Sequence, residues 1–266
     1  MTSEEQKNLW NTFHRFYKSR VRSYSPKVNE ALKKQVRQFI DAVRSGVPQQ
    51  QALTKVTSGP ILTVLKPLYL DAGITYGAKV LTYLRRQKAR MPIGFNRQMT
   101  ELMIRYFQTE LLNDAENISQ TTRDKIQQVL IESYPLGRSF DEIVSLLTDA
   151  EFTAIRARLI ARTETNTAAN TGAMLAAKTT GLKLNKIWIS AQDDRTRRVP
   201  RDENDHLHMN GQIIPYDDLF TIPGDGEKMA NPGDRKHGAG PGNLCNCRCT
   251  IGFKAVRDAS GRLITE

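Results

Sequence analysis

Lys186 to Gly211 is the stretch that decides the fold class of this chain, and it contains two informative runs. The first reads K-I-W-I-S-A-Q-D-D-R-T-R-R over residues 186–198, and the second reads D-H-L-H-M-N-G over residues 205–211. The apolar triplet Ile187 to Ile189 predicts a strand, and the Asp and Arg residues after it predict a charged turn. The histidines then fall in a loop, so the stretch predicts a small polar module built on a strand.

The segments on either side of this stretch extend the module. A long helix is predicted from Glu151 to near Gly181, and it carries the run R-T-E-T-N at residues 162–166. On the other side, a Gly/Pro-rich loop leads to the run N-L-C-N-C-R-C-T at residues 243–250, which holds all three cysteines. A final strand is predicted over residues 247–253. The module therefore combines one long helix with a few short strands.

Residues 1–150 predict a series of helices and contain no recognisable active-site motif. Apolar residues recur there at helical spacing, and Ser, Pro and Gly separate the segments. Ser25 and Pro26 are typical of a helix start, Pro67 is expected to kink or divide a helix, and Ser139 with Glu142 matches a capping box. The predicted helices span residues 3–20, 26–44, 48–56, 60–87, 96–112, 119–135 and 140–147.

The fold class predicted from these elements is α+β. A mainly α-helical N-terminal part is followed by a small α+β module with a long helix, few short strands and a Gly/Pro-rich loop. The predicted division is a basic helical part over residues 1–150, a module over residues 151–256 and a short tail over residues 257–266. A chain of 266 residues has room for this arrangement.

The charge of the chain is strongly positive and unevenly distributed. The formal net charge is +11, and residues 1–100 hold eighteen Lys and Arg against five Asp and Glu. Such a surface favours a polyanion as partner, either DNA or an acidic protein surface, although a basic helix face can also serve solubility alone. The best cluster for phosphate contact is the helix end at Arg85, Arg86, Lys88 and Arg90.

Two classes of protein are disfavoured by composition. No apolar run approaches the roughly 20 residues that cross a bilayer, and the opening M-T-S-E-E-Q-K lacks the apolar segment of a secretory signal. We therefore expect synthesis in the cytoplasm and no membrane partner. Three cysteines in a reducing compartment also argue against a disulfide framework.

Opposite charges in the C-terminal module predict buried ion pairs. We expect Glu164 on the long helix to pair with Arg195 or Arg197, and Arg162 to pair with Asp193 or Asp194. Pairs of this kind hold a fold in register.

Histidine and cysteine residues of the module allow two interpretations. His206, His208, Cys247 and Cys249 are the residue types that bind Zn²⁺, but the C-x-x-C pair typical of zinc sites is missing. If the C-x-C-x-C run is extended, Cys245, Cys247 and Cys249 lie on one face. The alternative is a histidine hydrogen-bonded to a carboxylate beside buried free thiols, with no cofactor.

Four short motifs in this order resemble one family. They are R-T-E at 162–164, W-x-x-x-x-D-D-R-T-R at 188–197, H-x-x-x-x-G at 206–211 and N-C-R-C at 246–249. The combination resembles the bacteriophage Mu F-like minor head proteins, also called phage head morphogenesis proteins, over roughly residues 150–252. His208 and Cys245 are extra to the pattern. The matched positions are Arg162, Glu164, Trp188, Asp194, Arg195, Arg197, His206, Gly211, Cys247, Arg248 and Cys249.

The resemblance implies a structural protein of the phage head and no enzymatic activity. Such a protein would be a minor capsid component of a tailed phage or prophage, bound at the portal vertex inside the head. Its partners would be the portal protein, packaged double-stranded DNA, and major capsid or scaffold proteins. Its location would be the virion, and the host cytoplasm during assembly.

Two other functions compete with this one. A metal-dependent nuclease or toxin-like enzyme would need a histidine base beside an acidic metal site, and His206 with Asp202 or Asp205 is the candidate set. The other is a DNA-binding accessory factor without capsid attachment, which a salt-dependent gel shift with weak sequence preference would favour.

Overall fold

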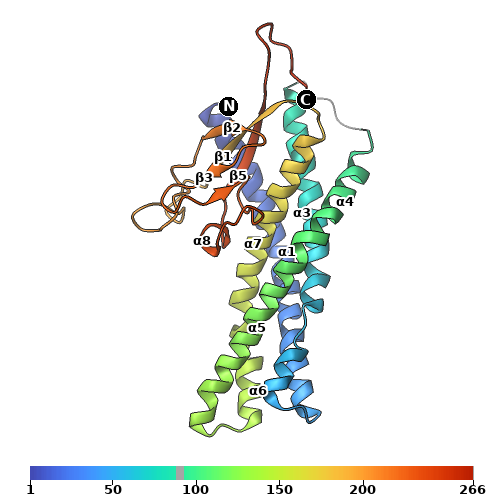
Figure 1. The fold of residues 1–266 in the computed structure, drawn as a ribbon, viewed down its shortest axis with the longest axis vertical. Coiled ribbons are helices and arrows are strands. Elements are labelled where there is room, and N and C mark those ends of the chain that lie inside the picture. The colour runs from blue at the N-terminus through green and yellow to red at the C-terminus, as the bar shows by residue number, and fades with distance from the viewer. Residues whose placement is uncertain (88–92, 266) are drawn as a thin grey trace. The chain divides into compact units, whose positions relative to one another are not determined.

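The computed structural model describes residues 1–87 and 93–265, and its order of elements is drawn in Figure 1. A series of helices comes first, and short antiparallel strands follow the long helix α7. The described α-helices are α1 (Ser3–Arg44), α2 (Gln49–Ala52), α3 (Gly59–Arg86), α4 (Phe95–Tyr106), α5 (Leu112–Ser133), α6 (Phe140–Thr148), α7 (Ala150–Lys178) and α8 (Pro241–Leu244). The predicted fold class is confirmed: the protein is mainly helical with a small α+β part.

The strands of the structure are short and fall in two sheets. A three-stranded sheet has the order β2-β1-β5, and a two-stranded sheet pairs β3 with β4, all antiparallel. The bounds are β1 (Leu184–Ile189), β2 (Ile213–Pro215), β3 (Phe220–Thr221), β4 (Lys228–Met229) and β5 (Thr250–Ala255). The strand predicted around Trp188 is therefore the central one, and β5 begins later than predicted because the cysteine run before it is not a strand.

The helix break predicted at Ser25 and Pro26 is absent from the structure, and the helix that contains Pro67 is not divided there. Helix α1 runs without interruption through Pro26, and helix α3 runs through Pro67. The prediction of a helix start at Ser25 was wrong: its hydroxyl donates to the carbonyl of Val21 at 2.7 Å inside α1. Buried side chains on both sides of Pro26 explain this, because packing of the apolar stripe offsets the lost backbone hydrogen bond.

The region between α4 and α5 also differs from the prediction. A π-helical turn at Phe107–Leu111 joins the two helices, and Ser119 lies inside α5 and does not begin a helix. Its hydroxyl donates to the carbonyl of Ala115 at 2.7 Å and accepts from Gln35 at 2.6 Å, so it completes a buried polar contact. The capping box of Ser139 and Glu142 at the start of α6 is confirmed.

The chain divides into two compact units. Unit 1 comprises Met1–Arg20, Leu68–Ile104 and Arg162–Glu266, and unit 2 comprises Val21–Pro67 and Arg105–Ala161. This division does not follow the expected boundary at residue 150, because α1, α3 and α7 each run from one unit into the other. The assignment of functions to residues 1–150 and 151–256 stays a prediction.

Unit 2 has a hydrophobic core of its own. Helices α1, α2, α5 and α6 and the turn that follows α2 contribute buried side chains that pack together. Beside this core, Gln35 accepts from the Thr122 hydroxyl at 2.9 Å, and Arg156 donates to the same hydroxyl at 2.7 Å. The core residues are Val36, Phe39, Ile40, Ala52, Leu53, Val56, Ile126, Leu130, Ile143 and Leu147.

In unit 1, helices α3 and α7 approach each other closely. A Cβ atom added at Gly172 would lie 2.1 Å from the carbonyl oxygen of Gly73, and one added at Gly77 would lie 2.9 Å from the carbonyl oxygen of Gly172. Only glycine fits at such a contact. The small residues of α7 therefore serve close packing, which positions this helix beside the sheet residues described below. None of the described helices combines the length and apolar character needed to cross a membrane.

Candidate metal centre

Strand pairing in unit 1 brings the histidine loop and the cysteine run together. His206 lies in the loop that follows β1, and the end of that loop returns to β1 because the amide of Gly211 donates to the carbonyl of Trp188 at 2.8 Å. Cys249 directly precedes β5, whose first residue, Thr250, lies opposite Ile189 of β1. Both segments therefore meet at the same end of the central strand.

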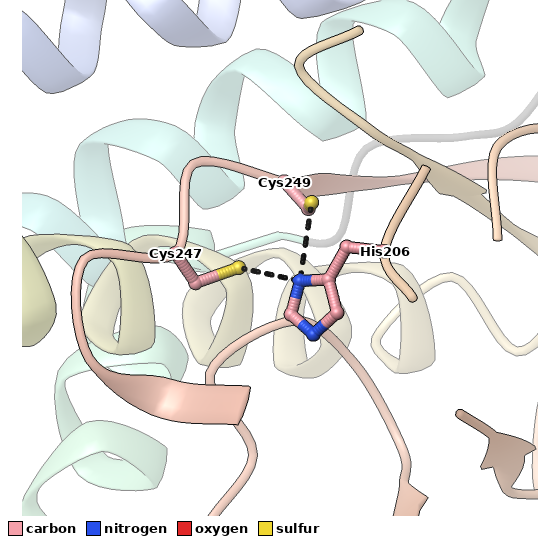
Figure 2. A group of neighbouring side chains, drawn as sticks. All are labelled: His206, Cys247 and Cys249. Atoms are coloured by element: carbon pink, nitrogen blue, oxygen red, sulfur yellow. Dashed lines mark hydrogen bonds between the residues drawn. The ribbon is translucent and has the colours of Figure 1, made fainter. Parts of the chain in front are cut away.

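Figure 2 shows that His206 points one ring nitrogen at two sulfur atoms. The Nδ1 atom lies 3.6 Å from the Sγ atom of Cys247 and 3.7 Å from the Sγ atom of Cys249. The three potential ligand atoms all lie within 4.8 Å of one another. The exposed fractions of these residues are 1%, 1% and 2%, so the group is closed to solvent.

The second ring nitrogen of His206 is fixed by a hydrogen-bond chain. Its Nε2 atom lies 2.7 Å from the Oδ1 atom of Asn243. The amide nitrogen of Asn243 donates to Asp225 at 2.7 Å and to Glu227 at 2.6 Å, so Oδ1 is an acceptor and Nε2 must donate to it. The chain of carboxylates, Asn243 and His206 therefore directs Nδ1 toward the sulfur atoms.

Helix α7 holds the cysteine run through its polar residues. Asn166 donates to the carbonyl of Cys249 at 2.9 Å, and Asn170 donates to the same carbonyl at 3.2 Å. The hydroxyl of Thr163 accepts from the amide of Asn246 at 3.2 Å. These contacts give the buried Thr and Asn residues of the predicted helix a role that the sequence analysis did not assign.

The spacing of these polar residues of α7 is a signal in the sequence by which they could have been found. Thr163, Asn166 and Asn170 recur at three- and four-residue intervals, so they lie on one face of α7. A polar stripe among alanines on a buried helix indicates contacts to backbone groups, which must be satisfied when buried. Asn243 carries no comparable signal, since its role depends on the loop that contains Asp225 and Glu227.

The three buried groups change one another's protonation. A hydrogen bond with Cys249 lowers the pKa of the Cys247 thiol, and the neighbouring His206 lowers that pKa further. Burial raises the pKa of the Cys249 thiol, and the Cys247 thiolate adds to this rise. Burial by itself lowers the pKa of His206, but the charge and hydrogen bond of Cys247 outweigh it and raise that pKa overall. The group thus favours a thiolate beside an imidazolium when only protons are bound.

His208 and Cys245 lie outside this group. The His208 side chain is 72% exposed, and its Nδ1 atom lies 2.5 Å from Asp205. Cys245 follows α8 and is half-buried, and Asn246 after it has a left-handed φ of 58°. Of the four residues named as candidate zinc ligands, the structure brings His206, Cys247 and Cys249 together and leaves His208 apart. The cysteine run is not a strand, so the condition for placing all three cysteines on one face is not met.

Glu164 forms a buried ion pair with a residue that the sequence analysis did not name. One carboxylate oxygen accepts from Arg235 at 2.6 Å, and the other accepts from the Tyr69 hydroxyl at 2.7 Å. The predicted partners lie elsewhere: Arg197 donates to the carbonyl of Cys245, and the Arg195 side chain is 75% exposed. The prediction of a buried pair at Glu164 is confirmed, and the predicted partner is wrong.

The second predicted ion pair is corrected in the same way. Asp193 pairs with both terminal nitrogens of Arg248, one of them at 2.6 Å, and this bidentate contact holds the pKa of Asp193 well below its usual range. Arg162 and Asp194, which the prediction placed in such a pair, are exposed. The carbonyl of Arg248 accepts from the Trp10 indole at 3.2 Å, so α1 also contacts this segment.

The remaining predicted site residues do not assemble into a catalytic group. Trp188 is fully buried, with its ring edge-on to that of His206 at 5.4 Å between centroids, and Gly211 adopts a φ of 82°. Asp202 binds Arg201, and Asp205 binds His208, so neither joins His206 in a nuclease-like site within residues 1–87 and 93–265.

The predicted DNA-contact cluster is described in part. Arg85 and Arg86 are exposed at the C-terminal end of α3. Lys88 and Arg90 lie outside the described residues.

The fold and the site define a helical protein with a small sheet module, which is held by a buried Glu164–Arg235 pair, a part-buried Asp193–Arg248 pair and a buried His–Cys group. Residues 124–252 match the family described as Phage Mu protein F like protein. This match confirms the resemblance to the Mu F-like phage head morphogenesis proteins that was found in the sequence. Comparisons with curated proteins and with solved structures found no match.

Proposed function

We propose that the protein is a minor capsid component that binds the portal vertex from inside the phage head and has a structural role. The family match supports head morphogenesis as the process. The burial of the His–Cys group is the observation that favours structure over catalysis, because a site whose residues are 1–2% exposed offers no access to a macromolecular substrate.

Exposed apolar side chains of unit 2 are the surface that we propose for portal binding. Large apolar residues exposed to solvent near the α5–α6 connection are costly unless a partner covers them. Those that we assign to this surface are Ile131, Tyr134, Leu136 and Leu146, with exposed fractions of 60%, 60%, 64% and 40%.

The test is capture of the portal ring by the full chain. The portal protein encoded beside this chain should co-purify with it, and a variant carrying Ile131→Ser, Leu136→Ser and Leu146→Ser should capture it at least tenfold less well. Val199→Ser is the matched control, since Val199 is 48% exposed in unit 1. Equal capture by both variants would exclude this surface, and no capture by the wild type would exclude portal binding.

Contact with packaged DNA is the second part of the proposal. Arg85 and Arg86 are exposed, and a side chain that neutralises a phosphate releases counterions, which makes binding salt-dependent. Removing the charges of Arg85 and Arg86 should weaken the salt dependence of binding to double-stranded DNA. The slope of the logarithm of the binding constant against the logarithm of the salt concentration should become less negative by about 1.8, at roughly 0.9 per contact. The control removes Arg97 and Arg195, which are 89% and 75% exposed. The same loss of slope in the control would show that net charge alone is responsible.

A further inference from the structure

We propose that His206, Cys247 and Cys249 form a zinc site with a structural role, in which Nδ1 and two thiolates bind one Zn²⁺. The three residues come from two segments separated by about 40 positions, and the fold brings their ligand atoms within 4.8 Å of one another. Imidazole nitrogen and cysteine sulfur are donors that zinc commonly binds in proteins. The inference concerns the stability of unit 1 and is independent of portal binding.

The two nitrogen–sulfur separations fit a tetrahedral zinc ion. With Zn–S bonds of about 2.3 Å and Zn–N bonds of about 2.0–2.1 Å, the nitrogen and sulfur ligands of a tetrahedral site lie about 3.5–3.6 Å apart. The Nδ1 atom of His206 lies 3.6 Å and 3.7 Å from the two sulfur atoms. The histidine nitrogen therefore already lies at the distance from each sulfur atom that a shared zinc ion requires.

The charge of the group also fits a divalent ion. Two thiolates neutralise Zn²⁺, so the complex carries no net charge and can stay in a buried position. At positions that are at most 2% exposed, a neutral complex avoids the cost of burying an unpaired charge.

The surroundings of His206 are those of a metal-bound histidine. Ligating histidines usually donate their other ring nitrogen to a second group that fixes the ring. Here Nε2 donates to Asn243, which itself donates to Asp225 and Glu227. The carboxylates therefore hold Asn243, and Asn243 holds the histidine ring with Nδ1 directed at the sulfur atoms.

The group supplies three protein ligands, and we assign the fourth position to a water molecule. Within the part of the chain that the structure describes, no other His, Cys, Asp or Glu side chain belongs to the group. His208 is held by Asp205, and Cys245 is only half-buried. These two residues make matched controls, because each lies two positions from a proposed ligand in the same segment.

The experiment measures metal content in the full chain, purified without chelators. We expect about one zinc per chain by elemental analysis. Replacing zinc by Co²⁺ should produce the intense visible bands of tetrahedral cobalt and a thiolate-to-cobalt charge-transfer band. Cys247→Ser, Cys249→Ser and His206→Gln should each reduce the metal content to near zero, whereas Cys245→Ser and His208→Gln should retain about one zinc per chain.

X-ray absorption at the zinc edge of the wild-type protein tests the ligand set without any variant. Two sulfur atoms at about 2.3 Å and two lighter atoms at about 2.0–2.1 Å are expected. A folded, metal-free protein that gives no charge-transfer band with Co²⁺ would overturn the proposal. Loss of zinc from Cys245→Ser or His208→Gln equal to the loss from the ligand variants would overturn the assignment of ligands.

Discussion

Glu164 is the residue whose replacement should most clearly destabilise unit 1. Its side chain is 4% exposed and pairs with Arg235, whose side chain is 16% exposed. Glu164→Ala leaves the guanidinium buried without its carboxylate, and we expect a loss of about 3 kcal/mol in the free energy of unfolding. Urea denaturation of the purified variant measures this loss.

Arg195→Ala is the control for that prediction. Arg195 is 75% exposed and lies 3.7 Å from Asp193, so its removal should change the free energy of unfolding by less than about 0.5 kcal/mol. The double variant Glu164→Ala/Arg235→Ala should lose less than the sum of the single variants, because both members of the pair are then absent. Strict additivity would contradict a direct interaction.

Lys186 should make the stability of unit 1 depend on pH in the alkaline range. This residue is fully buried in β1, and its ammonium nitrogen lies 5.5 Å from the centre of the Phe220 ring. Burial lowers the pKa of Lys186 to about 8, against about 10.4 in an unfolded chain. Below pH 8 the folded state therefore carries a buried charge at full cost, and that cost disappears as the pH rises from about 8 to 10.4.

Lys186→Met removes this charge and keeps most of the side-chain volume. At pH 7 we expect the variant to be more stable than the wild type by roughly 1–3 kcal/mol. The difference should shrink as the pH rises above 8, because the wild-type amine then becomes neutral in the folded state. Thermal unfolding of both proteins across pH 7–10 measures it, and a constant difference would show that the charge of Lys186 is not responsible.

At the scale of single residues, the sequence predicted which types of residue form contacts better than it predicted which particular residues pair. The Arg and carboxylate residues of the C-terminal module do form pairs, and two of its cysteines do meet His206. The partner of Glu164 lies in a Gly/Pro-rich loop without periodicity, so no sequence pattern could indicate that Arg235 returns to α7. His208 and His206 are chemically equivalent in the sequence, and only the fold buries one of them.

At the scale of elements, the contact between α3 and α7 should be disrupted by any side chain larger than that of glycine at Gly172. A Cβ at Gly172 would lie 2.1 Å from the backbone of Gly73, and no side-chain rotation can relieve a backbone clash. We expect Gly172→Ala to destabilise unit 1 by about 3 kcal/mol, at the upper end of the cost of overpacking, although alanine is the better helix former. Thermal unfolding measures the change.

Gly59→Ala is the control for the glycine prediction. Gly59 begins α3, and the nearest atom to an added Cβ there is 3.7 Å away, at Thr57. The substitution should be neutral or stabilising by up to about 1 kcal/mol. Equal destabilisation by the two substitutions would show that helix propensity, and not the clash at Gly73, decides the result.

The helices also show where local signals decide structure and where packing overrides them. The capping box at Ser139 was predicted correctly, because its contacts lie within four consecutive residues. The breaks predicted at Pro26 and Ser119 were wrong, because buried side chains before and after these residues continue the apolar stripe. Helix continuity there depends on neighbours that are distant in sequence, which single-sequence patterns do not contain.

At the scale of the whole molecule, the compact units are built from separated segments. Unit 1 includes the first twenty residues, and Trp10 of α1 donates to the carbonyl of Arg248 far along the chain. A sequence pattern divides the chain at one boundary, because it compares neighbouring segments only. It contains no sign that the first turns of α1 and the strand β5 belong to the same unit.

This division leads to a prediction for metal removal, which rests on the proposed zinc site. The His–Cys group belongs to unit 1, and the core of unit 2 contains no residue of that group. Structural zinc contributes to folding free energy, so a chelator should weaken the unit that contains the ion. Hydrogen exchange should therefore become faster in β1 and β5 after treatment with a strong chelator.

Amides of α5 and α6 around Ile126, Leu130 and Ile143 provide the internal reference for this measurement. Their exchange should change much less than that of β1 and β5, because local opening follows the unit that loses contacts. The variant His208→Gln should respond to the chelator as the wild type does. If β1 and β5 keep their protection after all metal is removed, the His–Cys group stabilises unit 1 by hydrogen bonds alone, and equal acceleration in both units would mean that they unfold together.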